Sequence, residues 1–303
     1  MSAADTATNV DAPLGAPARV PTPPAGDPRL ARLALNQKTT DGWDLQDLVA
    51  GCLDAGLPAV GLWREPVQAH GVERAAALVR EAGLRVSSLC RGGFLTTDDP
   101  AGRQNALADN RHAIDEAATL GAPCLVMVVG GLPAGSTDLR GARARVAAAL
   151  EDLVPHALDR GVQLALEPLH PLFCADRAVL STLGQALDLA APYPAEAVGV
   201  VVDAYHVWWD PQLDAQIARA AGRIASYQVC DFVLPLADDP LLSRGMMGDG
   251  FVDFASLSRA VAAAGYDGDV EVEIFDRALW DADPRQVVDT VKRRYVELVE
   301  PSL

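Results

Sequence analysis

The sequence predicts an α/β fold, a single (β/α)8 barrel with eight parallel strands. Three observations favour this fold class. Short apolar runs alternate with longer segments in which apolar residues recur every three to four positions, as expected for strands that alternate with helices. The 303 residues suit one such barrel of roughly 250 residues with modest extensions. No G-x-G-x-x-G follows the first strand, which argues against an open dinucleotide-binding sheet.

The candidate strands are eight apolar runs, most of them nearly continuous, as strands covered on both faces should be. They cover Leu33 to Gln37, Ala59 to Trp63, Val86 to Cys90, Cys124 to Val129, Leu164 to Pro168, Gly199 to Asp203, Ser226 to Asp231 and Val270 to Phe275. Eight is the number of strands that closes a small barrel. Several helix-patterned segments between them end in a glycine suited to a left-handed cap: Gly56, Gly83, Gly121, Gly161 and Gly265.

Two segments depart from this alternation. Residues 1–28 are rich in Ala, Pro and Thr and lack the basic start and apolar stretch of a secretory signal, so we expect a disordered N-terminal extension before a barrel at 29–303. The connection from 232 to 252 is too long for an ordinary loop of this fold and is rich in Gly, Pro and Asp. Long loops at this rim of a barrel are often functional lids.

The composition excludes several classes of partner. A net charge of −16 repels phosphate backbones and anionic membrane surfaces, so no nucleic acid and no membrane is expected as a partner. No apolar run is long enough to span a bilayer. The five cysteines are odd in number and scattered, without a C-x-x-C, which argues against disulfides or a thiolate zinc site and fits a cytoplasmic location.

Carboxylates at predicted strand ends are the first candidates for chemistry. Glu167 closes the fifth strand, Asp203 closes the sixth and Glu273 interrupts the eighth, while Gln228 lies within the seventh. In a barrel, polar residues at the carboxyl ends of strands face the active site. Carboxylates among apolar neighbours need a neutralising partner, and this all-oxygen set suits Mn²⁺ or Mg²⁺ better than zinc or copper. The alternative is a structural layer in which Glu167 and Glu273 pair with arginines.

The chain resembles the xylose isomerase-like TIM barrel superfamily of sugar phosphate isomerases and epimerases. The resemblance spans about residues 33 to 298 and rests on an ordered set of motifs, E-P, D-x-x-H, Q-V-x-D, R-G-x-x-G-x-G-x-x-D-F and E-V-E. It implies a metal held by Glu167, Asp203, Gln228 and Glu273. Gln228 departs from the pattern, which usually has His there, and this puts metal binding at risk. An amide oxygen can still ligate a cation.

The resemblance also implies roles around the metal. His206 matches the D-x-x-H histidine that contacts substrate in ketose epimerases, and Arg244 matches their substrate-binding arginine. Glu167 and Glu273 would serve as catalytic base and acid, as in those enzymes. A metal bridging adjacent oxygens of a hydroxy ketone stabilises an enediolate, and return of the proton to the opposite face or to a neighbouring atom gives epimerisation or isomerisation.

His170, within E-P-L-H-P, is a further catalytic candidate. This motif, together with QVCDFVLPL and RGMMGDG, also resembles the catalytic subunits of C-glycoside deglycosidases, which cleave 3-oxo-C-glycosides and associate with a small second subunit. In that hypothesis His170 is a base and the enediolate expels an aglycone. The structural alternative is a histidine that only caps the rim by hydrogen bonding.

Cations and tryptophans follow strands in the first half of the chain. Lys38, Arg64 and Arg91 are candidates to hold an anionic substrate, or equally to pair with the metal carboxylates. Trp63 is a candidate to face a sugar ring, although buried packing is the commoner use of tryptophan.

Together these features predict a metal-dependent sugar isomerase or epimerase acting on a small sugar-like molecule. Two alternatives stay open: a lyase that cleaves the carbon–carbon bond of a 3-oxo-C-glycoside, and a catalytically inactive barrel that binds sugar or a partner. The sequence does not decide whether the partner is a second copy in a homo-oligomer or a small second subunit.

Overall fold

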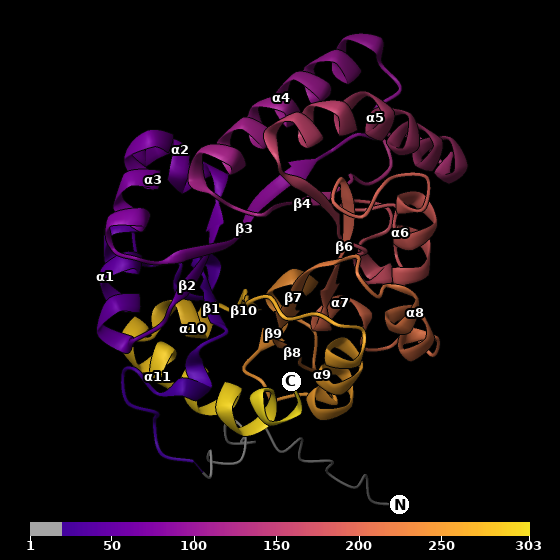
Figure 1. The fold of residues 1–303 in the computed structure, drawn as a ribbon. Coiled ribbons are helices and arrows are strands. Elements are labelled where there is room, and N and C mark those ends of the chain that lie inside the picture. Colours follow the sequence, from indigo (N-terminus) through magenta and orange to yellow (C-terminus); the bar gives the residue numbers. More distant parts are fainter. Residues whose placement is uncertain (1–19) are drawn as a thin grey trace, which may run out of the picture.

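A closed barrel of eight parallel strands forms the centre of the computed structural model, which describes residues 20–303. The strands neighbour one another in the order β1-β10-β7-β6-β5-β4-β3-β2, and β2 returns to β1 (Figure 1). Their bounds are β1 Leu33–Asn36, β2 Ala59–Trp63, β3 Arg85–Gly93, β4 Cys124–Val128, β5 Gln163–Leu166, β6 Val198–Asp203, β7 Ile224–Val229 and β10 Val270–Val272. The predicted fold class is therefore confirmed.

Helices surround the barrel and connect its strands (Figure 1). They are α1 Leu45–Ala55, α2 Arg64–His70, α3 Val72–Glu81, α4 Pro100–Leu120, α5 Leu139–Arg160, α6 Leu183–Ala190, α7 Ala204–Val207, α8 Leu213–Arg219, α9 Phe254–Ala263, α10 Arg277–Asp281 and α11 Pro284–Leu298. Asp44 and Asp99 accept backbone hydrogen bonds at the starts of α1 and α4, and Gly56 and Gly121 end these helices in the left-handed conformation. The aspartates and glycines thus mark where the chain changes element.

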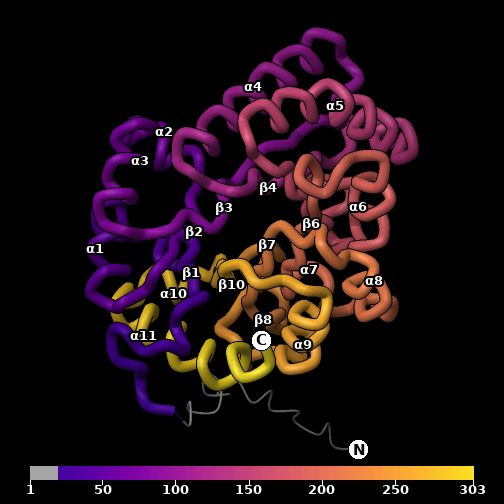
Figure 2. Tube along the Cα trace, in the orientation of Figure 1, coloured from indigo at the N-terminus to yellow at the C-terminus, as the bar shows by residue number. Residues whose placement is uncertain are grey.

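Short 3-10 turns complete the connections: η1 Pro28–Leu30, η2 Gln37–Thr40, η3 Pro171–Phe173, η4 Pro240–Leu242 and η5 Glu300–Ser302. The last of these packs beside α9, so the C-terminus lies close to that helix (Figure 2). No helix in residues 20–303 combines the length and apolarity that a membrane span requires.

The long connection after β7 forms a two-stranded antiparallel hairpin, β8 Asp231–Phe232 with β9 Arg244–Gly245. The buried carboxylate of Asp231 accepts the backbone N–H groups of Phe232, Gly248 and Val252 at 2.9 to 3.0 Å. One carboxylate of β8 therefore holds the segment that follows β9, through Gly248 and Val252.

The predicted N-terminal extension falls mostly on residues 1–19, outside the described residues. Its described part packs against the barrel's helices, because Thr22 accepts a hydrogen bond of 2.8 Å from Arg293 in α11 and Val20 packs on the core. The chain thus contacts the barrel before the predicted boundary at residue 29.

The barrel interior has an apolar side and a polar side. Cys124, Val126, Ala165 and Val201 line the side formed by β4, β5 and β6. The other side carries buried polar residues: Asn36 on β1, Ser88 on β3, Gln228 on β7 and Glu271 on β10. Gly61 on β2 makes room for the Glu271 carboxylate, because a methyl group at this position would overlap it.

We predict that Gly61→Ala lowers the free energy of unfolding by about 1–3 kcal/mol, the usual effect of overpacking a filled interior. Urea denaturation measures this change. Gly42→Ala is the matched control, because a methyl group there meets only a carbonyl oxygen of Trp280 at 3.8 Å, and it should change stability by less than about 0.5 kcal/mol. Equal effects of the two substitutions would contradict the assigned role of Gly61.

Candidate metal centre and active site

Four predicted ligands come from consecutive strands of the barrel. Glu167 directly follows β5, Asp203 ends β6, Gln228 lies in β7 and Glu273 directly follows β10. Asp203 is the register partner of Gln228, which in turn is opposite Glu271 on β10. All four side chains are buried, at 4% exposure or less. The strand order therefore brings the predicted oxygens to one end of the barrel.

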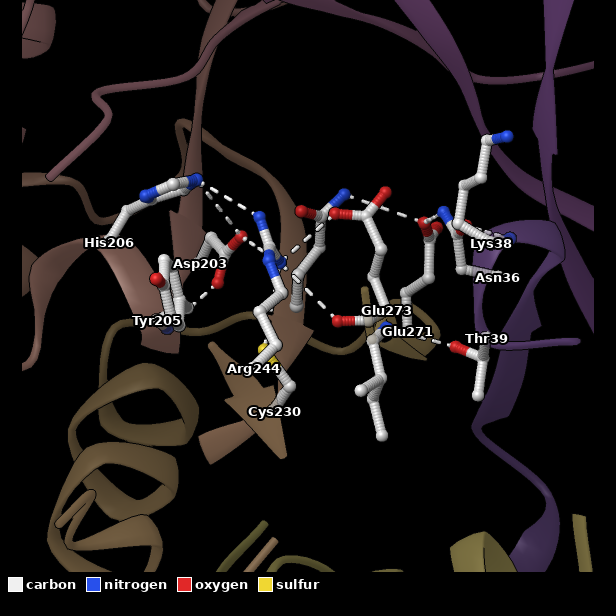
Figure 3. A network of polar contacts seen from close by, with 12 residues as sticks. Asn36, Lys38, Thr39, Asp203, Tyr205, His206, Cys230, Arg244, Glu271 and Glu273 are labelled. Atoms are coloured by element: carbon white, nitrogen blue, oxygen red, sulfur yellow. Dashed lines mark hydrogen bonds and ion pairs between the residues drawn. The ribbon is translucent and has the colours of Figure 1, made fainter. Parts of the chain in front are cut away.

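Arg244 lies between two of these carboxylates (Figure 3). Its Nη1 donates to Asp203 Oδ2 at 2.9 Å and to Glu273 Oε2 at 3.2 Å, and the guanidinium lies over the ring of Tyr205. Asp203 uses its other oxygen to accept the backbone N–H of Tyr205 at 2.8 Å, which begins α7. A buried guanidinium thus partly neutralises the site. For Glu273, this is the pairing with arginine that was the alternative to metal binding.

His206 also lies in this cluster. One ligand atom each from Glu167, Asp203 and His206 lies within 4.8 Å of the others, a grouping compatible with metal binding. The sequence assigned His206 to substrate contact rather than to the metal. Its D-x-x-H spacing brings it here, because Asp203 ends the strand and the one-turn helix α7 turns His206 back over it.

Both nitrogens of His206 face hydrogen-bond donors. Nδ1 accepts the backbone N–H of His170 at 3.1 Å, and Nε2 lies 3.0 Å from Arg244 Nη2. Burial and the neighbouring Arg244 lower the pKa of His206 well below its ordinary value, so the ring is neutral. A neutral ring has one lone pair, so the His170 backbone N–H and the Arg244 guanidinium compete for it.

The site has more negative charge than its arginine neutralises. Three buried carboxylates, those of Glu167, Asp203 and Glu273, stand against one guanidinium, which leaves a formal charge of −2. Glu273 Oε1 and Gln228 Oε1 are buried with no hydrogen-bond partner in the described chain. Two unsatisfied oxygens and a deficit of two positive charges fit a divalent cation held by oxygen ligands.

Burial raises the pKa values of all three carboxyl groups. Burial, followed by repulsion from Asp203 and Glu273, raises the pKa of Glu167 well above its ordinary value. Burial raises the pKa of Glu273 to about 8, although Arg244 opposes the shift. The pKa of Asp203 is also raised by burial against the opposing effect of Arg244. The two glutamates that the sequence assigned to proton transfer therefore both have raised pKa values.

A small cavity of about 40 Å³ opens beside this cluster. It is lined by Glu167, His206, Arg244 and Glu273 together with Trp63, Cys90, Arg91, Val128, Leu169, Arg177, Leu241 and Phe275. Trp63 packs edge to face on Phe275, with ring centroids 5.6 Å apart. A larger cavity of about 360 Å³ lies elsewhere, around residues 222–225 and 264–269, and includes none of the predicted site residues.

The three predicted rim cations differ in placement. Arg91 lines the cavity and lies over the rings of Trp63 and Phe94, and no ion pair to it forms within residues 20–303. Lys38 lies over Trp63 but pairs with Asp41 at 2.7 Å. Both cations therefore stay close to the cavity wall.

Arg64 does not line the cavity. Its guanidinium bonds Asp109 at 3.0 Å and Glu116 at 2.6 Å, both on α4. The sequence pattern placed Arg64 at the rim because it follows β2, yet it begins α2, and the acidic residues of the neighbouring helix bind it. The expectation that Arg64 holds substrate is thus at odds with its position.

His170 takes the place that the capping alternative described. Its Nδ1 accepts the N–H of Leu172 at 3.3 Å and begins the turn η3, while its ring stacks on Phe232 with centroids 5.5 Å apart. Burial lowers its pKa, so the ring is neutral with its proton on Nε2. This arrangement leaves no lone pair for a base at neutral pH.

Sequence reasoning missed two residues near the centre. Glu271 forms hydrogen bonds to Asn36, Ser87, Ser88 and Gln228 inside the barrel. The available signal was E-V-E, in which both glutamates point to the same side of a strand. Arg177 lines the cavity and pairs with Asp239 at 3.1 Å, and nothing in its loop sequence marks it.

Comparison with known proteins identifies the family. The sequence model of the xylose isomerase-like TIM barrel family matches residues 49–294. The chain belongs to this family. No curated protein matches the chain.

Solved structures extend the likeness. Protein SMc04130 from Sinorhizobium meliloti 1021 is 44% identical, with a TM-score of 0.86 over 89% of this chain and 99% of that chain. IolI, described with a bound zinc atom, is 20% identical, with a TM-score of 0.78 over 90% and 99% of the two chains. An L-ribulose 3-epimerase is 20% identical, with a TM-score of 0.70 over 86% and 92%. The last two share the fold with this barrel.

We predict that wild-type protein without metal loses stability relative to Glu273→Gln as the pH rises from about 4.5 to about 8. The folded pKa of Glu273 is raised from 4.5 to about 8, so the folded state retains a proton that the unfolded chain releases in this range. Unfolding in this pH range therefore releases a proton, and rising pH favours the unfolded state. Thermal unfolding of both proteins in chelator measures the difference, and parallel pH profiles would contradict the raised pKa.

We further predict that Arg64→Met lowers the free energy of unfolding by about 1–3 kcal/mol, because it leaves the partly buried Glu116 without its charged partner. Arg285→Met is the matched control, since its pair with Asp54 is exposed and should contribute less than about 1 kcal/mol. Urea denaturation gives both values. A ligand-affinity change in Arg64→Met without a stability change would restore the substrate role.

Proposed function

We propose that the protein is a divalent-metal-dependent isomerase or epimerase of small hydroxy ketones of the sugar class. The observation that carries this proposal is the buried cluster of Glu167, Asp203 and Glu273, whose formal charge Arg244 only partly offsets, beside a small cavity. Raised pKa values at the same carboxyl groups support proton transfer as the reaction. An epimerase among the neighbours of the same fold is consistent with this reaction class.

The cation would be held by Glu167, Asp203, Gln228 and Glu273. One ring nitrogen of His206 lies within 4.8 Å of a carboxylate oxygen of Glu167 and of Asp203. An oxygen set of this kind favours Mn²⁺ or Mg²⁺. When bound, the cation supplies Lewis-acid polarisation of the substrate carbonyl. Its charge also offsets the excess negative charge of the cluster.

Glu167 and Glu273 exchange the proton in this proposal. They follow β5 and β10, which β6 and β7 separate, so they approach the cavity from different sides. One carboxylate removes the proton from the carbon next to the carbonyl, and the electron pair moves to the carbonyl oxygen as an enediolate. The other carboxyl group returns a proton to the opposite face of that carbon, or to the neighbouring carbon, which gives the epimer or the isomer.

Neighbouring residues bind and orient the substrate. His206 and Arg244 both line the cavity, where they would contact substrate oxygens, and Arg244 would do so with the same guanidinium that contacts Asp203. Trp63 and Phe275 form an apolar wall that excludes water from the enediolate. Because the lone pair of His170 is occupied, we assign it no role as a base.

Deuterium exchange tests the reaction. A screen of ketoses in D₂O with the Mn²⁺-loaded protein should show incorporation next to the carbonyl, and Glu273→Gln should slow it by about 10²- to 10⁴-fold, the usual contribution of a positioned acid or base. Asp54→Asn is the matched control, a carboxylate-to-amide change at an exposed surface pair. Exchange at the wild-type rate in Glu273→Gln would refute the role of this residue.

Metal removal gives an independent prediction. Elemental analysis of the purified protein should find a divalent metal, chelation should abolish exchange, and added Mn²⁺ should restore it, because the carbonyl then regains its polarising charge. Unchanged exchange after complete chelation would exclude the metal-dependent mechanism.

A further inference from the structure

Glu271 is a buried carboxylate that the proposed reaction does not use. It lies in β10, fully buried, and no Lys or Arg in the described chain pairs with it. Its oxygens instead accept four hydrogen bonds, from Asn36 Nδ2 at 2.6 Å, Ser87 Oγ at 2.6 Å, Ser88 Oγ at 2.8 Å and Gln228 Nε2 at 3.4 Å. Four donors from three neighbouring regions of the barrel therefore converge on one acceptor.

We propose that Glu271 is a positioning residue that turns the side-chain amide of Gln228 so that its oxygen, and not its nitrogen, faces the metal centre. The proposal rests on the metal centre of the proposed function. It assigns to Glu271 no contact with the metal and no contact with substrate.

Asn36 shows independently that Glu271 acts as an acceptor (Figure 3). Asn36 Oδ1 accepts the indole N–H of Trp63 at 3.0 Å and the backbone N–H of Lys38 at 2.9 Å. These two groups can only donate, so the oxygen of Asn36 must face them and its nitrogen must face Glu271. The Glu271 oxygen that meets this nitrogen is consequently an acceptor.

The same oxygen of Glu271, Oε1, also accepts a hydrogen bond from Gln228 Nε2. The two ends of an amide have nearly the same shape, so only their hydrogen-bond partners decide which end points where. An acceptor behind Gln228 draws its Nε2 toward Glu271, which leaves Gln228 Oε1 buried without a partner. An unpartnered buried oxygen costs stability in the folded chain unless something else ligates it.

Register places Gln228 beside the other proposed ligands. Gln228 is opposite Asp203 on one side and Glu271 on the other, and Glu273 follows Glu271 by two residues, directly after β10. If the amide were reversed, its N–H groups would face the cation and repel it. With Glu271 behind it, a glutamine supplies an oxygen at the position where the family resemblance implied a histidine.

Calorimetric titration of Mn²⁺ into metal-free protein tests the proposal without relying on activity. Glu271→Gln can donate to Gln228 Oε1 and so permits the reversed amide. We expect it to weaken Mn²⁺ binding by about 10- to 100-fold, the usual effect of removing a group that orients a ligand. Ser258→Ala is the matched control, since it removes a buried hydrogen bond to Tyr227 on β7 and should change Mn²⁺ affinity by less than about twofold.

A double-mutant cycle separates positioning from general damage. In a Gln228→Ala background, Glu271→Gln should cause no further loss of Mn²⁺ affinity, because the side chain through which it acts is gone. An equal loss in both backgrounds, or wild-type affinity in Glu271→Gln alone, would overturn the proposal. Glu271→Asp replaces Glu271→Gln if the latter does not fold, as it withdraws the carboxylate from Gln228, and the same loss is expected.

The outcomes also distinguish the two proposals. Wild-type protein that binds no Mn²⁺ would refute the proposed function, and the role of Glu271 with it. Wild-type protein that binds Mn²⁺ with an affinity indifferent to Glu271 would refute only the positioning role.

Discussion

The structure depends on the electrostatics of carboxylates buried at one end of the barrel. Isolated ions in such a place each cost several kcal/mol, which neighbouring charges must offset. Arg244 supplies one positive charge to Asp203 and Glu273, and Glu167 contributes a third negative charge nearby. Strand order and the hairpin that carries Arg244 bring these groups together beside a small cavity.

The barrel interior accommodates these carboxylates because its apolar and polar side chains lie on opposite sides. Barrels of this class commonly fill their centre with layers of branched apolar side chains. Here β4, β5 and β6 contribute small or apolar residues, whereas the opposite side offers Gly61, Ser88 and Asn36 around Glu271. The polar side includes Gln228, so a hydrogen bond from Gln228 to Glu271 connects it to the site.

Much of this arrangement could be predicted from the sequence, because alternation along the chain reports which faces are buried. The eight strands and the convergence of Glu167, Asp203 and Glu273 follow from strand ends meeting at one rim. Arg64 shows the limit: its sequence position resembles that of Arg91, yet acidic residues on α4, distant in sequence, hold it. For Glu271, the E-V-E motif marks a second glutamate on the same side of the strand but not the four donors that bind it. Arg177 escaped notice because its partner, Asp239, is distant in sequence.

Arg244 enters the site from a hairpin that is separate from the barrel strands and is fastened by the carboxylate of Asp231. The residues proposed as ligands, in contrast, lie in the barrel strands or directly after them. Substitutions within the hairpin can therefore exchange the positive group, or its reach, while the framework keeps its geometry. The division makes the hairpin the natural place for substrate preference to diverge among barrels that retain the same ligand set.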